Sequence, residues 1–286
     1  QEAEASQKRI NEFLKEQPEI QNTGKITTSI NGKITFENVS YTYDDTNIKA
    51  LTDVNFTINK GETIAILGKT GSGKSTILSL LTRIHDVTGS SKIKIDDKNL
   101  VDYDIYHLRK NMSIVTQDPF LFSDSIKNNI KFGKEDASDE EIIDAAKMAV
   151  VDDTIQLFTN KYETVLGERG ITLSGGQKQR VSIARAIIKE APILILDDCL
   201  SAVDTETEEK IITNFKTIFK HKTTIIVTHR ASAAKKADKI IILDEGRIVQ
   251  EGTHKELVNQ EGFYQDLYIK QPVSYTHLTL PTNREV

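Results

Sequence analysis

The sequence predicts an α/β fold built around a parallel sheet, and three observations support that prediction. Short apolar runs such as Thr63–Leu67 and Ile193–Leu196 are typical of strands covered on both faces, which need no polar alternation. Segments with helical periodicity separate these runs, as expected where parallel strands are joined by crossovers. The chain has 286 residues, 38% of them hydrophobic, and is therefore long enough to bury one large core.

The elements follow from local pattern in chain order. Strands are predicted over Lys33–Val39, Asn55–Ile58, Thr63–Leu67, Ile193–Leu196, Thr224–Thr228 and Lys239–Leu243. Helices are predicted over Ser75–Ile84, Gln177–Ile188 and Lys255–Tyr268, with a hairpin turn at Asp244–Arg247. The charges at 138–147 are most simply a solvated helix face.

A phosphate-binding loop is predicted between the third strand and the first of these helices. Gly68–Ser75 matches the pattern G-x-x-x-x-G-K-S/T, and a strand before it and a helix after it disfavour a merely flexible glycine-rich loop. Lys74 is expected to meet the β and γ phosphates, and the Ser75 hydroxyl to ligate Mg²⁺. The residues expected to contact the nucleotide are Gly68, Thr70, Gly71, Ser72, Gly73, Lys74, Ser75 and Thr76.

A metal-positioning carboxylate is predicted where the apolar run Ile193–Leu196 ends in Asp197 and Asp198. Ligands of open α/β sheets collect at the carboxyl ends of the strands, so Asp197 is expected beside the Mg²⁺. An acidic strand end that faces solvent is the alternative, and a phosphate loop in the same chain disfavours it.

A second anion-binding pattern is the segment Leu173–Gln177, just ahead of a predicted helix. Backbone N–H groups, a hydroxyl and a helix N-terminus together favour an anion. An ordinary helix cap is the alternative, because serine followed by glycines also suits an N-cap. One chain thus carries two half-sites for phosphate, which suggests that another subunit completes the pocket.

In this order the motifs resemble the nucleotide-binding domain of ATP-binding cassette (ABC) proteins, over roughly residues 31–271. The resemblance implies a P-loop NTPase with a RecA-like parallel-sheet core, an N-terminal antiparallel β subdomain and an inserted α-helical subdomain at about 123–186. It also implies that Tyr43 stacks on adenine, and that Gln117 in the Q-loop meets Mg²⁺ or the attacking water. His229 would be the switch histidine on the γ-phosphate.

In that family two domains pair head to tail, and each ATP lies between one P-loop and the opposite signature. The signature residues Ser174, Gly175, Gly176 and Gln177 would therefore bind the partner's nucleotide, and Ser201–Asp204 would be the D-loop. The implied cofactors are ATP and Mg²⁺. The implied partners are a second nucleotide-binding domain, in a homodimer or heterodimer, and a transmembrane domain of the same polypeptide.

Asp198 departs from the family pattern, which usually has a glutamate there to polarise the attacking water. Aspartate is one methylene shorter, and a misplacement of roughly 1 Å can cost about a hundredfold in rate. The catalytic residues are thus expected to be Asp198, His229, Gln117 and Lys74, in a slow ATPase coupled to transport. The alternative is an impaired, mainly ATP-binding regulatory cassette of a heterodimeric exporter.

Residues 1–30 resemble the linker that follows the last membrane helix of exporter-type proteins. A short helix there would place Ile10, Phe13 and Leu14 on one face and end before Pro18. The loop Gly167–Gly170 resembles the segment with which exporter domains touch membrane helices. These features favour an exporter at the cytoplasmic face of the inner (plasma) membrane, with drug, lipid and peptide substrates equally open.

Composition and motif content argue against several other functional classes. The net charge of −5 argues against a nucleic-acid partner, and Cys199 as the only cysteine is expected to pack in the core. The chain has one P-loop and no long coiled coil, unlike tandem-cassette ribosomal proteins and chromosome-maintenance ATPases, and a simple P-loop kinase would lack the signature. Residues 272–286 are expected to be non-native or disordered, and the other histidines to be ordinary surface or core residues.

Overall fold

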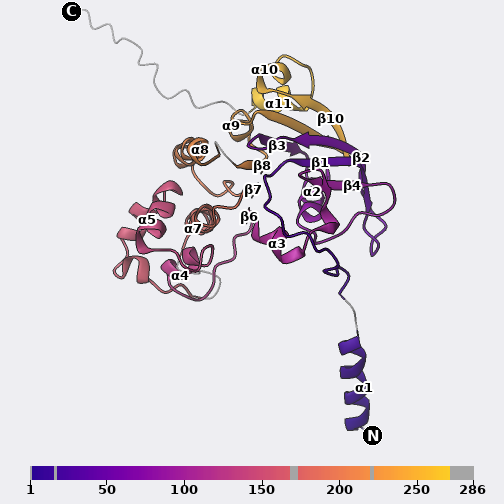
Figure 1. Ribbon diagram of the computed structural model, residues 1–286. Coiled ribbons are helices and arrows are strands. Elements are labelled where there is room, and N and C mark those ends of the chain that lie inside the picture. The colour runs from indigo at the N-terminus through magenta and orange to yellow at the C-terminus, as the bar shows by residue number, and fades with distance from the viewer. Residues whose placement is uncertain (1, 16–17, 168–172, 220–221, 271–286) are drawn as a thin grey trace, which may run out of the picture.

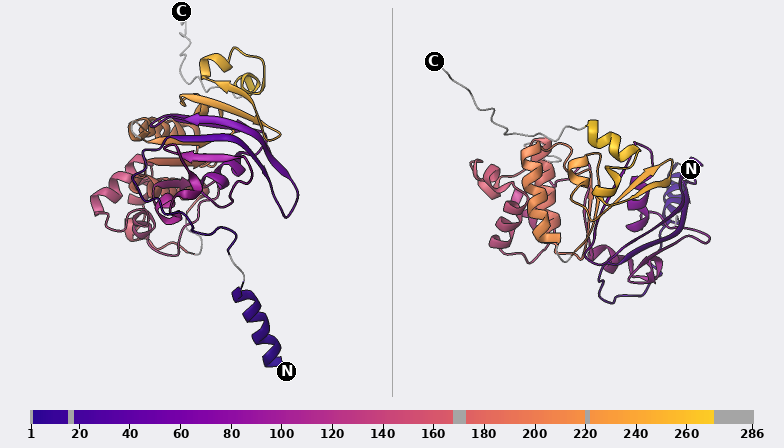
Figure 2. Two further views of the ribbon diagram at one scale, coloured as in Figure 1. Left: turned by 45° about the vertical axis from the view of Figure 1, so that its right-hand side comes forward. Right: turned by 90° about the horizontal axis from the view of Figure 1, so that it is seen from above.

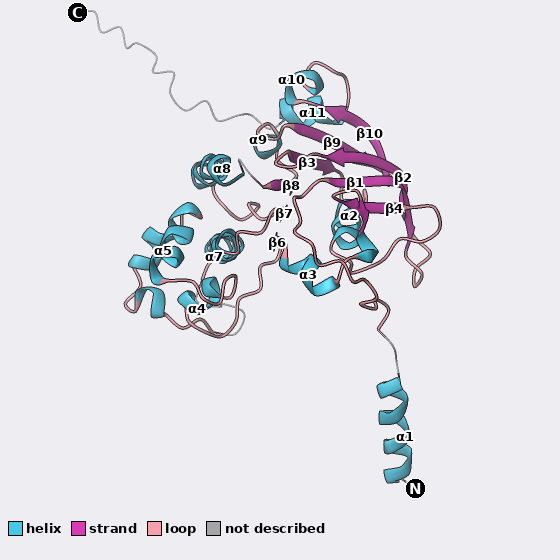
Figure 3. Cartoon of the chain, viewed as in Figure 1, coloured by secondary structure: helices cyan, strands magenta, loops and turns pink. Residues whose placement is uncertain are grey.

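The computed structural model describes residues 2–15, 18–167, 173–219 and 222–270 (Figures 1 and 3). The predicted loop at 168–170 and the tail at 272–286 lie outside these ranges. The fold contains two β-sheets, and most helices pack around the larger one. The α/β fold predicted from the sequence is confirmed.

The larger sheet has six strands in the order β10-β9-β3-β8-β7-β6. Its strands are β3 (Thr63–Gly68), β6 (Met112–Val115), β7 (Ile193–Asp197), β8 (Thr223–Val227), β9 (Lys239–Asp244) and β10 (Arg247–Gly252). All neighbours pair in parallel except β10, which forms the predicted hairpin with β9. Because β3, β7 and β8 are buried almost throughout, their sequences are nearly continuous apolar runs.

The smaller sheet is antiparallel, in the order β2-β1-β4-β5. Its strands are β1 (Ile34–Thr42), β2 (Lys49–Ile58), β4 (Lys92–Ile95) and β5 (Lys98–Asn99). The pairing of β1 with β2 shifts register between Phe36 and Val39, where Asn38 adopts a positive φ of 49°. These irregularities are β-bulges, which is why both strands run further than the regular pattern in the sequence predicts.

The helices fall into four groups. The first contains the isolated α1 (Glu2–Lys15), and the second contains α2 (Lys74–Leu81) and α3 (Ile105–Lys110). The third comprises α4 (Ile126–Lys131), α5 (Asp139–Met148), α6 (Asp152–Gln156), α7 (Gly175–Ile188) and α8 (Thr205–Phe219). The last comprises α9 (Ala231–Ala234), α10 (His254–Leu257) and α11 (Phe263–Lys270). Figure 2 shows from two further sides that the third group lies on one flank, away from the antiparallel strands.

Helix α2 is packed between the two sheets. Its Ile77 and Leu81 share one apolar cluster with Phe36 of β1 and Ile66 of β3. Burying an isoleucine or leucine side chain contributes about 1.5–3 kcal/mol, so this layer fixes the start of α2 against both sheets. The loop that precedes α2 is thereby held at the edge of the parallel sheet.

The predicted closing helix over Lys255–Tyr268 is wrong as a single element. The chain forms α10 and α11 instead, and it turns between them at Gly262. A Cβ at Gly262 would lie 2.5 Å from the side chain of Gln250, so this glycine packs closely against β10. Helical periodicity continues across the break, which is why the sequence pattern does not reveal it.

Candidate functional site

The strand order brings four separate segments to one edge of the parallel sheet. The loop 68–75 follows β3, His229 follows β8 by two residues, Asp197 ends β7, and Gln117 follows β6 by two residues. These four strands are parallel and adjacent, so their carboxyl ends meet on one side. Loops from neighbouring parallel strands form the ligand sites of such sheets.

The loop before α2 is a backbone cradle whose charged residue is already in place. Gly73 caps α2 with φ at +104°, and a Cβ there would lie 2.7 Å from the carbonyl oxygen of Ala50. Lys74 is only 6% exposed, and its Nζ donates to the carbonyl oxygens of Gly68 and Lys69, both at 2.8 Å. The ammonium group is therefore held across the mouth of the loop, where it can exchange these carbonyls for phosphate oxygens.

Tyr43 lies against the same loop and helix. Its hydroxyl and Thr76 Oγ1 are 3.1 Å apart, so a side-chain hydrogen bond joins the residue that follows β1 to α2. Tyr41 packs edge-on against the Tyr43 ring with centroids 5.0 Å apart. An aromatic ring is thus fixed next to the phosphate loop, as base stacking would require.

The two carboxylates after β7 share the field of Lys74 and His229. Burial first, and then the charge of Asp198, raise the pKa of Asp197, while Lys74 and His229 act in the opposite direction. Burial also raises the pKa of Asp198, and His229 and Arg230 oppose that shift. Burial lowers the pKa of Lys74, against the charges of Asp197 and Asp198. These reciprocal effects place the predicted metal, base and phosphate residues in one electrostatic cluster.

Asp198 adopts an unusual backbone conformation. Its φ is +43°, in the left-handed region that aspartate tolerates better than most residues. Its N–H donates to the carbonyl oxygen of Val227 at 2.8 Å, and the backbone N–H of His229 hydrogen-bonds to its carboxylate. Two hydrogen bonds therefore fix this residue to the end of β8.

Gln179 is a site residue that motif analysis missed. It lies on the buried face of α7, and its Nε2 donates to the carbonyl oxygen of Gln117 at 3.4 Å and to Ser201 Oγ at 3.2 Å. Its Oε1 accepts from the backbone N–H of Ala202 at 3.1 Å. One side chain thus joins the Gln117 loop to the segment 201–204. No local sequence pattern marks this role, because Gln179 stands between the charged residues Lys178 and Arg180 and its burial is visible only in the structure.

The predicted signature segment forms the N-terminus of α7. Ser174 Oγ accepts from the N–H of Gln177 at 3.3 Å, and Gln177 Oε1 accepts from the N–H of Ser174 at 2.9 Å. Ser174 thus caps α7 through a capping box, as serine before two glycines can do. It leaves the N–H groups of Gly175 and Gly176 at the first turn of a long helix, where they can also face an anion.

Gly176 packs directly against the segment 201–204, and this contact predicts a sharp difference between two neighbouring glycines. A Cβ at Gly176 would lie 2.7 Å from the Ala202 carbonyl oxygen, whereas one at Gly175 would meet only the Ala202 Cβ, at 3.5 Å. Gly176→Ala should therefore destabilise the chain by about 1–3 kcal/mol through overpacking. Gly175→Ala should be neutral or slightly stabilising; thermal melting compares the two, and equal melting temperatures would contradict the prediction.

Arg230, one residue beyond His229, ties three elements together. Its Nη1 donates to the carboxylate of Glu208 in α8, and its Nη2 donates to the carbonyl oxygen of Ser201 at 2.9 Å. Glu208 also accepts from Ser232 Oγ at 2.9 Å. The glutamate side chain is 2% exposed and the arginine 30%. The segment after β8 and the segment after β7 are thereby linked by a largely buried ion pair.

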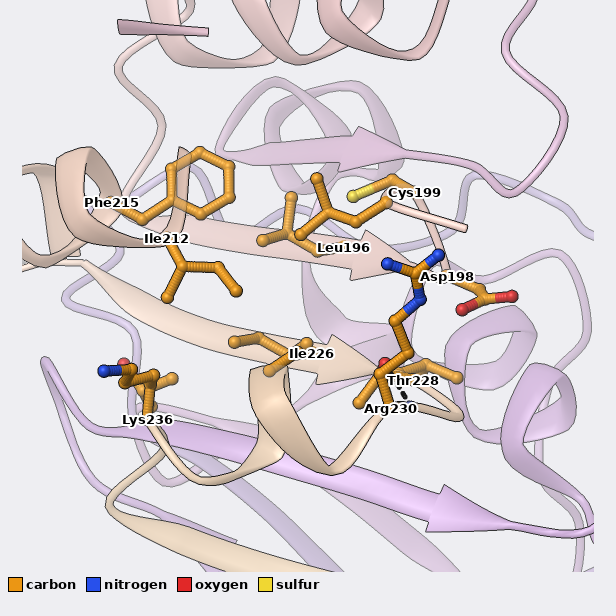
Figure 4. Close-up of a pocket in the computed structure, with 13 residues that line it drawn as sticks. Leu196, Asp198, Cys199, Ile212, Phe215, Ile226, Thr228, Arg230 and Lys236 are labelled. Atoms are coloured by element: carbon orange, nitrogen blue, oxygen red, sulfur yellow. Dashed lines mark hydrogen bonds between the residues drawn. The ribbon is translucent and has the colours of Figure 1, made fainter. Parts of the chain in front are cut away.

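A small cavity lies behind this pair, between α8 and the strands β7 and β8 (Figure 4). Its volume is about 30 Å³, and apolar side chains such as Leu196, Ile212 and Ile226 form most of its wall. A space of this size has room for only one or two waters, so it is no nucleotide pocket. Cys199 borders it and is 2% exposed, and burial raises the pKa of its thiol. The prediction that Cys199 packs in the core is confirmed.

The residues at this edge suit a magnesium ion. Mg²⁺ takes one or two protein oxygens and completes its shell with phosphate and water, so it does not require a cage of acids. Ser75 is exposed in the first turn of α2, and the half-buried Asp197 ends β7. In the described ranges, no three His, Cys, Asp or Glu residues group as a self-sufficient metal site. The donor set therefore fits an ion that arrives with a phosphate ligand.

Comparison with known proteins gives consistent matches. The ABC transporter family profile matches residues 51–201. YfiB of Bacillus subtilis (strain 168), an ABC transporter ATP-binding protein, is 45% identical over 269 residues, which are 94% of this chain and 46% of that protein. A protein of Staphylococcus aureus (strain NCTC 8325 / PS 47), named for multidrug export as an ATP-binding/permease protein, is 46% identical over 83% of this chain and 41% of its own length.

A solved structure agrees with these matches. The ATP-bound form of a bacterial Atm1-family ABC exporter superposes with a TM-score of 0.88 at 36% identity, over 93% of this chain and 47% of that one. The chain thus spans about half the length of the relatives that it matches. Within its described residues, no helix combines the length and the apolar character needed to cross a membrane. The chain belongs to the ABC transporter family, as one of its ATP-binding domains.

Proposed function

We propose that this chain is the ATP-hydrolysing motor domain of an ABC exporter and dimerises around ATP to drive substrate across a membrane. The observation that carries the proposal is the convergence of Lys74, Asp197, Asp198 and His229 at one sheet edge. Such a cluster combines a phosphate cation, a magnesium ligand, a carboxylate for the attacking water and a γ-phosphate contact. Residues 31–271 would form the domain, with a helical subdomain at about 123–186 and a linker at 1–30.

In this proposal each residue acts through its own chemistry. Bound Mg²⁺ would neutralise phosphate charge, held by Ser75, Asp197 and the Gln117 side chain. Lys74 would leave the carbonyls of Gly68 and Lys69 for the β and γ phosphates. His229 would hold the γ-phosphate and orient the attacking water. The Asp198 carboxylate would accept a proton from that water.

The signature would act on a second copy or a related domain. Gly175 and Gly176 open a helix of 14 residues, and their N–H groups together with Ser174 and Gln177 suit the γ-phosphate of a nucleotide bound opposite. Because Gly176 abuts Ala202, the segment 201–204 would move with the signature. Closure of the pair would depend on ATP, since only a triphosphate reaches both half-sites.

An exposed aromatic cluster supports a membrane-domain partner in the same polypeptide. Phe120, Phe122 and Phe132 are 54%, 38% and 67% exposed, and Arg185 lies over two of these rings. Phe132 and Arg185 also line a groove of about 460 Å³ between the parallel sheet and the helical group. Exposed apolar patches beside a groove are typical of interaction sites. This face would receive the membrane domain, at the cytoplasmic side of the plasma membrane.

A catalytically impaired regulatory cassette is the second candidate, and Asp198 favours it. The shorter carboxylate is also held back by the His229 N–H and faces the charge of Arg230. Its oxygen would fall short of the water by roughly 1 Å, which can cost about a hundredfold in rate. Such a domain would bind ATP normally and turn it over slowly.

Asp198→Glu tests both candidates. Restoring the methylene should raise single-turnover hydrolysis of Mg·ATP by about a hundredfold, whereas Asp198→Asn should reduce it further. Glutamate tolerates a positive φ less well than aspartate, so a thermal melt must accompany the assay. Asp144→Glu, in the exposed face of α5, is the matched control and should change nothing.

The outcomes separate the two candidates. If Asp198→Glu folds normally but hydrolyses ATP at the rate of the parent chain, then the short Asp198 side chain is not the cause of slow hydrolysis. Brisk hydrolysis by the parent chain that Asp198→Asn abolishes would identify a competent motor and reject the impaired cassette. Hydrolysis that is unaffected by Asp198→Asn would reject this aspartate as the base.

A further inference from the structure

The turn that follows α2 contacts both the linker, at Gln21, and α3, at Arg109. Arg83 is 2% exposed with φ at +52°, and it forms a two-point ion pair with Asp86, with Nε and Nη2 at 2.9 and 2.8 Å from the carboxylate oxygens. Its Nη2 also lies 3.4 Å from the carbonyl oxygen of Gln21. From the other side, Arg109 donates to the carbonyl oxygen of Arg83 at 2.7 Å. The turn is therefore fixed rigidly at the end of the phosphate-loop helix.

His85, two residues beyond Arg83 in this turn, packs against the rings of Tyr41 and Tyr43. Its ring lies at 89° to that of Tyr43 with centroids 5.5 Å apart, and at 34° to Tyr41 with centroids 5.6 Å apart. Tyr43 and Tyr41 are themselves perpendicular, at 5.0 Å. Three rings thus form a closed triangle of contacts, and edge-to-face pairs of this kind contribute about 0.5–1.5 kcal/mol beyond burial.

The hydroxyl of Tyr43 is held as well, by Thr76. With its ring packed against two neighbours and its tip hydrogen-bonded, Tyr43 has one defined plane before any nucleotide arrives. A stacking face that is already oriented binds more tightly, because no rotamer entropy is lost on binding.

The other side of His85 faces the linker. Its Nδ1 is buried and has no hydrogen-bond partner among the described residues, and the Glu19 carboxylate lies 3.5 Å away. The linker beyond Glu19 is docked firmly, since Asn22 donates to Asp104 at 2.7 Å and accepts from the N–H of Ile105 at 2.9 Å. Burial first, and then the Glu19 charge, raise the pKa of Tyr41, which is consistent with this carboxylate lying beside the ring triangle.

We infer that His85 is a positioning residue for the nucleotide base, and that Glu19 in the linker sets its orientation. His85 holds the Tyr43 ring in the plane that receives adenine, so a displacement of the linker at Glu19 changes the affinity for the base through this ring. This inference rests on the proposed function, in which Tyr43 stacks on adenine. It revises the expectation that His85 is an ordinary histidine.

If the inference is correct, a change at His85 must weaken binding of the base and leave binding of the phosphates unchanged. Calorimetric titration of the 286-residue chain with Mg²⁺ and either AMP-PNP or inorganic tripolyphosphate separates the two, because only AMP-PNP carries a base. Stacking on an aromatic residue is worth about 1–3 kcal/mol, so a partial loss in His85→Ala should weaken AMP-PNP binding about fivefold. Tripolyphosphate binding should stay unchanged. His107→Ala, a histidine that hydrogen-bonds to the Thr28 carbonyl oxygen instead, is the matched control.

The linker contact is tested by a double-mutant cycle. His85→Phe keeps a ring in place but cannot pair with a carboxylate, so it should weaken AMP-PNP binding only about twofold, by the loss of the Glu19 contact alone. Glu19→Gln should weaken AMP-PNP binding about twofold when His85 is present, as expected of a weak, partly exposed pair, and should have no effect in the His85→Phe background.

Each result supports or overturns the inference. Equal weakening of both ligands in His85→Ala would mean that the histidine only stabilises the fold, and unchanged AMP-PNP affinity would remove it from base binding. If Glu19→Gln still weakened AMP-PNP binding in the His85→Phe background, Glu19 would not act through His85. Failure of the parent chain to bind AMP-PNP would instead overturn the proposed function itself.

Discussion

Methionine in place of Lys74 should abolish measurable ATP hydrolysis and weaken AMP-PNP binding by about ten- to a hundredfold. Hydrogen bonds to charged groups contribute about 1.5–3 kcal/mol, which sets the expected loss in affinity. The loss in rate should be larger, about a hundred- to a thousandfold, because a preorganised cation stabilises the charge of the transition state. Methionine keeps the unbranched stem that is buried in the loop, so the change removes mainly the charge.

The neighbouring Lys69 provides a matched control. Its side chain is exposed, whereas its carbonyl oxygen is one of the two that hold Lys74 Nζ. Lys69→Met removes the same charge five residues away and should change hydrolysis by less than about twofold, as expected for an exposed charge screened by salt. Phosphate release and calorimetric titration measure both effects. Hydrolysis by Lys74→Met within threefold of the parent chain would contradict the assignment of this lysine.

The central part of the fold was predictable because its strands are buried on both faces. The apolar runs at β3, β7, β8 and β9 gave boundaries within one residue of those in the structure. The antiparallel strands were harder, since β2 begins at Lys49 and not at Asn55. Asp53 adopts a positive φ within it, and such a residue breaks the alternation on which prediction depends.

The candidate site likewise contains residues that local sequence patterns predict and residues that they do not. The phosphate loop, Asp197 and the signature could be predicted because short-range patterns fix the backbone that their chemistry needs. Gln179, Glu208 and His85 were not found, because each acts through a residue far away in the chain. The hydrogen bond of Gln179 to the Gln117 carbonyl spans 62 positions. A side chain that links two loops has no local pattern, and only the packing of α7 against the sheet brings these groups together.

The second large effect is expected at the Arg230–Glu208 pair, and it should differ for its two members. Arg230→Met leaves Glu208 as a charge with 2% exposure, and Ser232 is its remaining side-chain partner in the part of the chain that the structure describes. Breaking a buried pair in this way costs about 3–5 kcal/mol, and the partial exposure of Arg230 suggests the lower end, about 3 kcal/mol. For a chain of this size that corresponds to a fall in melting temperature of about 6–12 °C.

The double variant distinguishes an unpaired charge from lost packing. Glu208→Gln alone should cost about 1 kcal/mol, since the amide oxygen can still accept from Arg230 and the amide NH2 can donate to Ser232 Oγ. Added to Arg230→Met, the same change should raise stability, because it removes the unpaired buried carboxylate. Lys210→Met, which breaks the exposed pair with Glu206 on the same helix, should leave the melting curve unchanged.

A further fall in melting temperature in the double variant would show that Arg230 acts by packing its stem and not by charge. The distinction matters for the site, because the guanidinium also holds the Ser201 carbonyl and faces Asp198. If the pair acts through charge, its loss should free the segment 201–204 and lower hydrolysis in proportion to the loss of stability. If it acts through packing, methionine should preserve the position of that segment, and the rate should stay close to that of the parent chain.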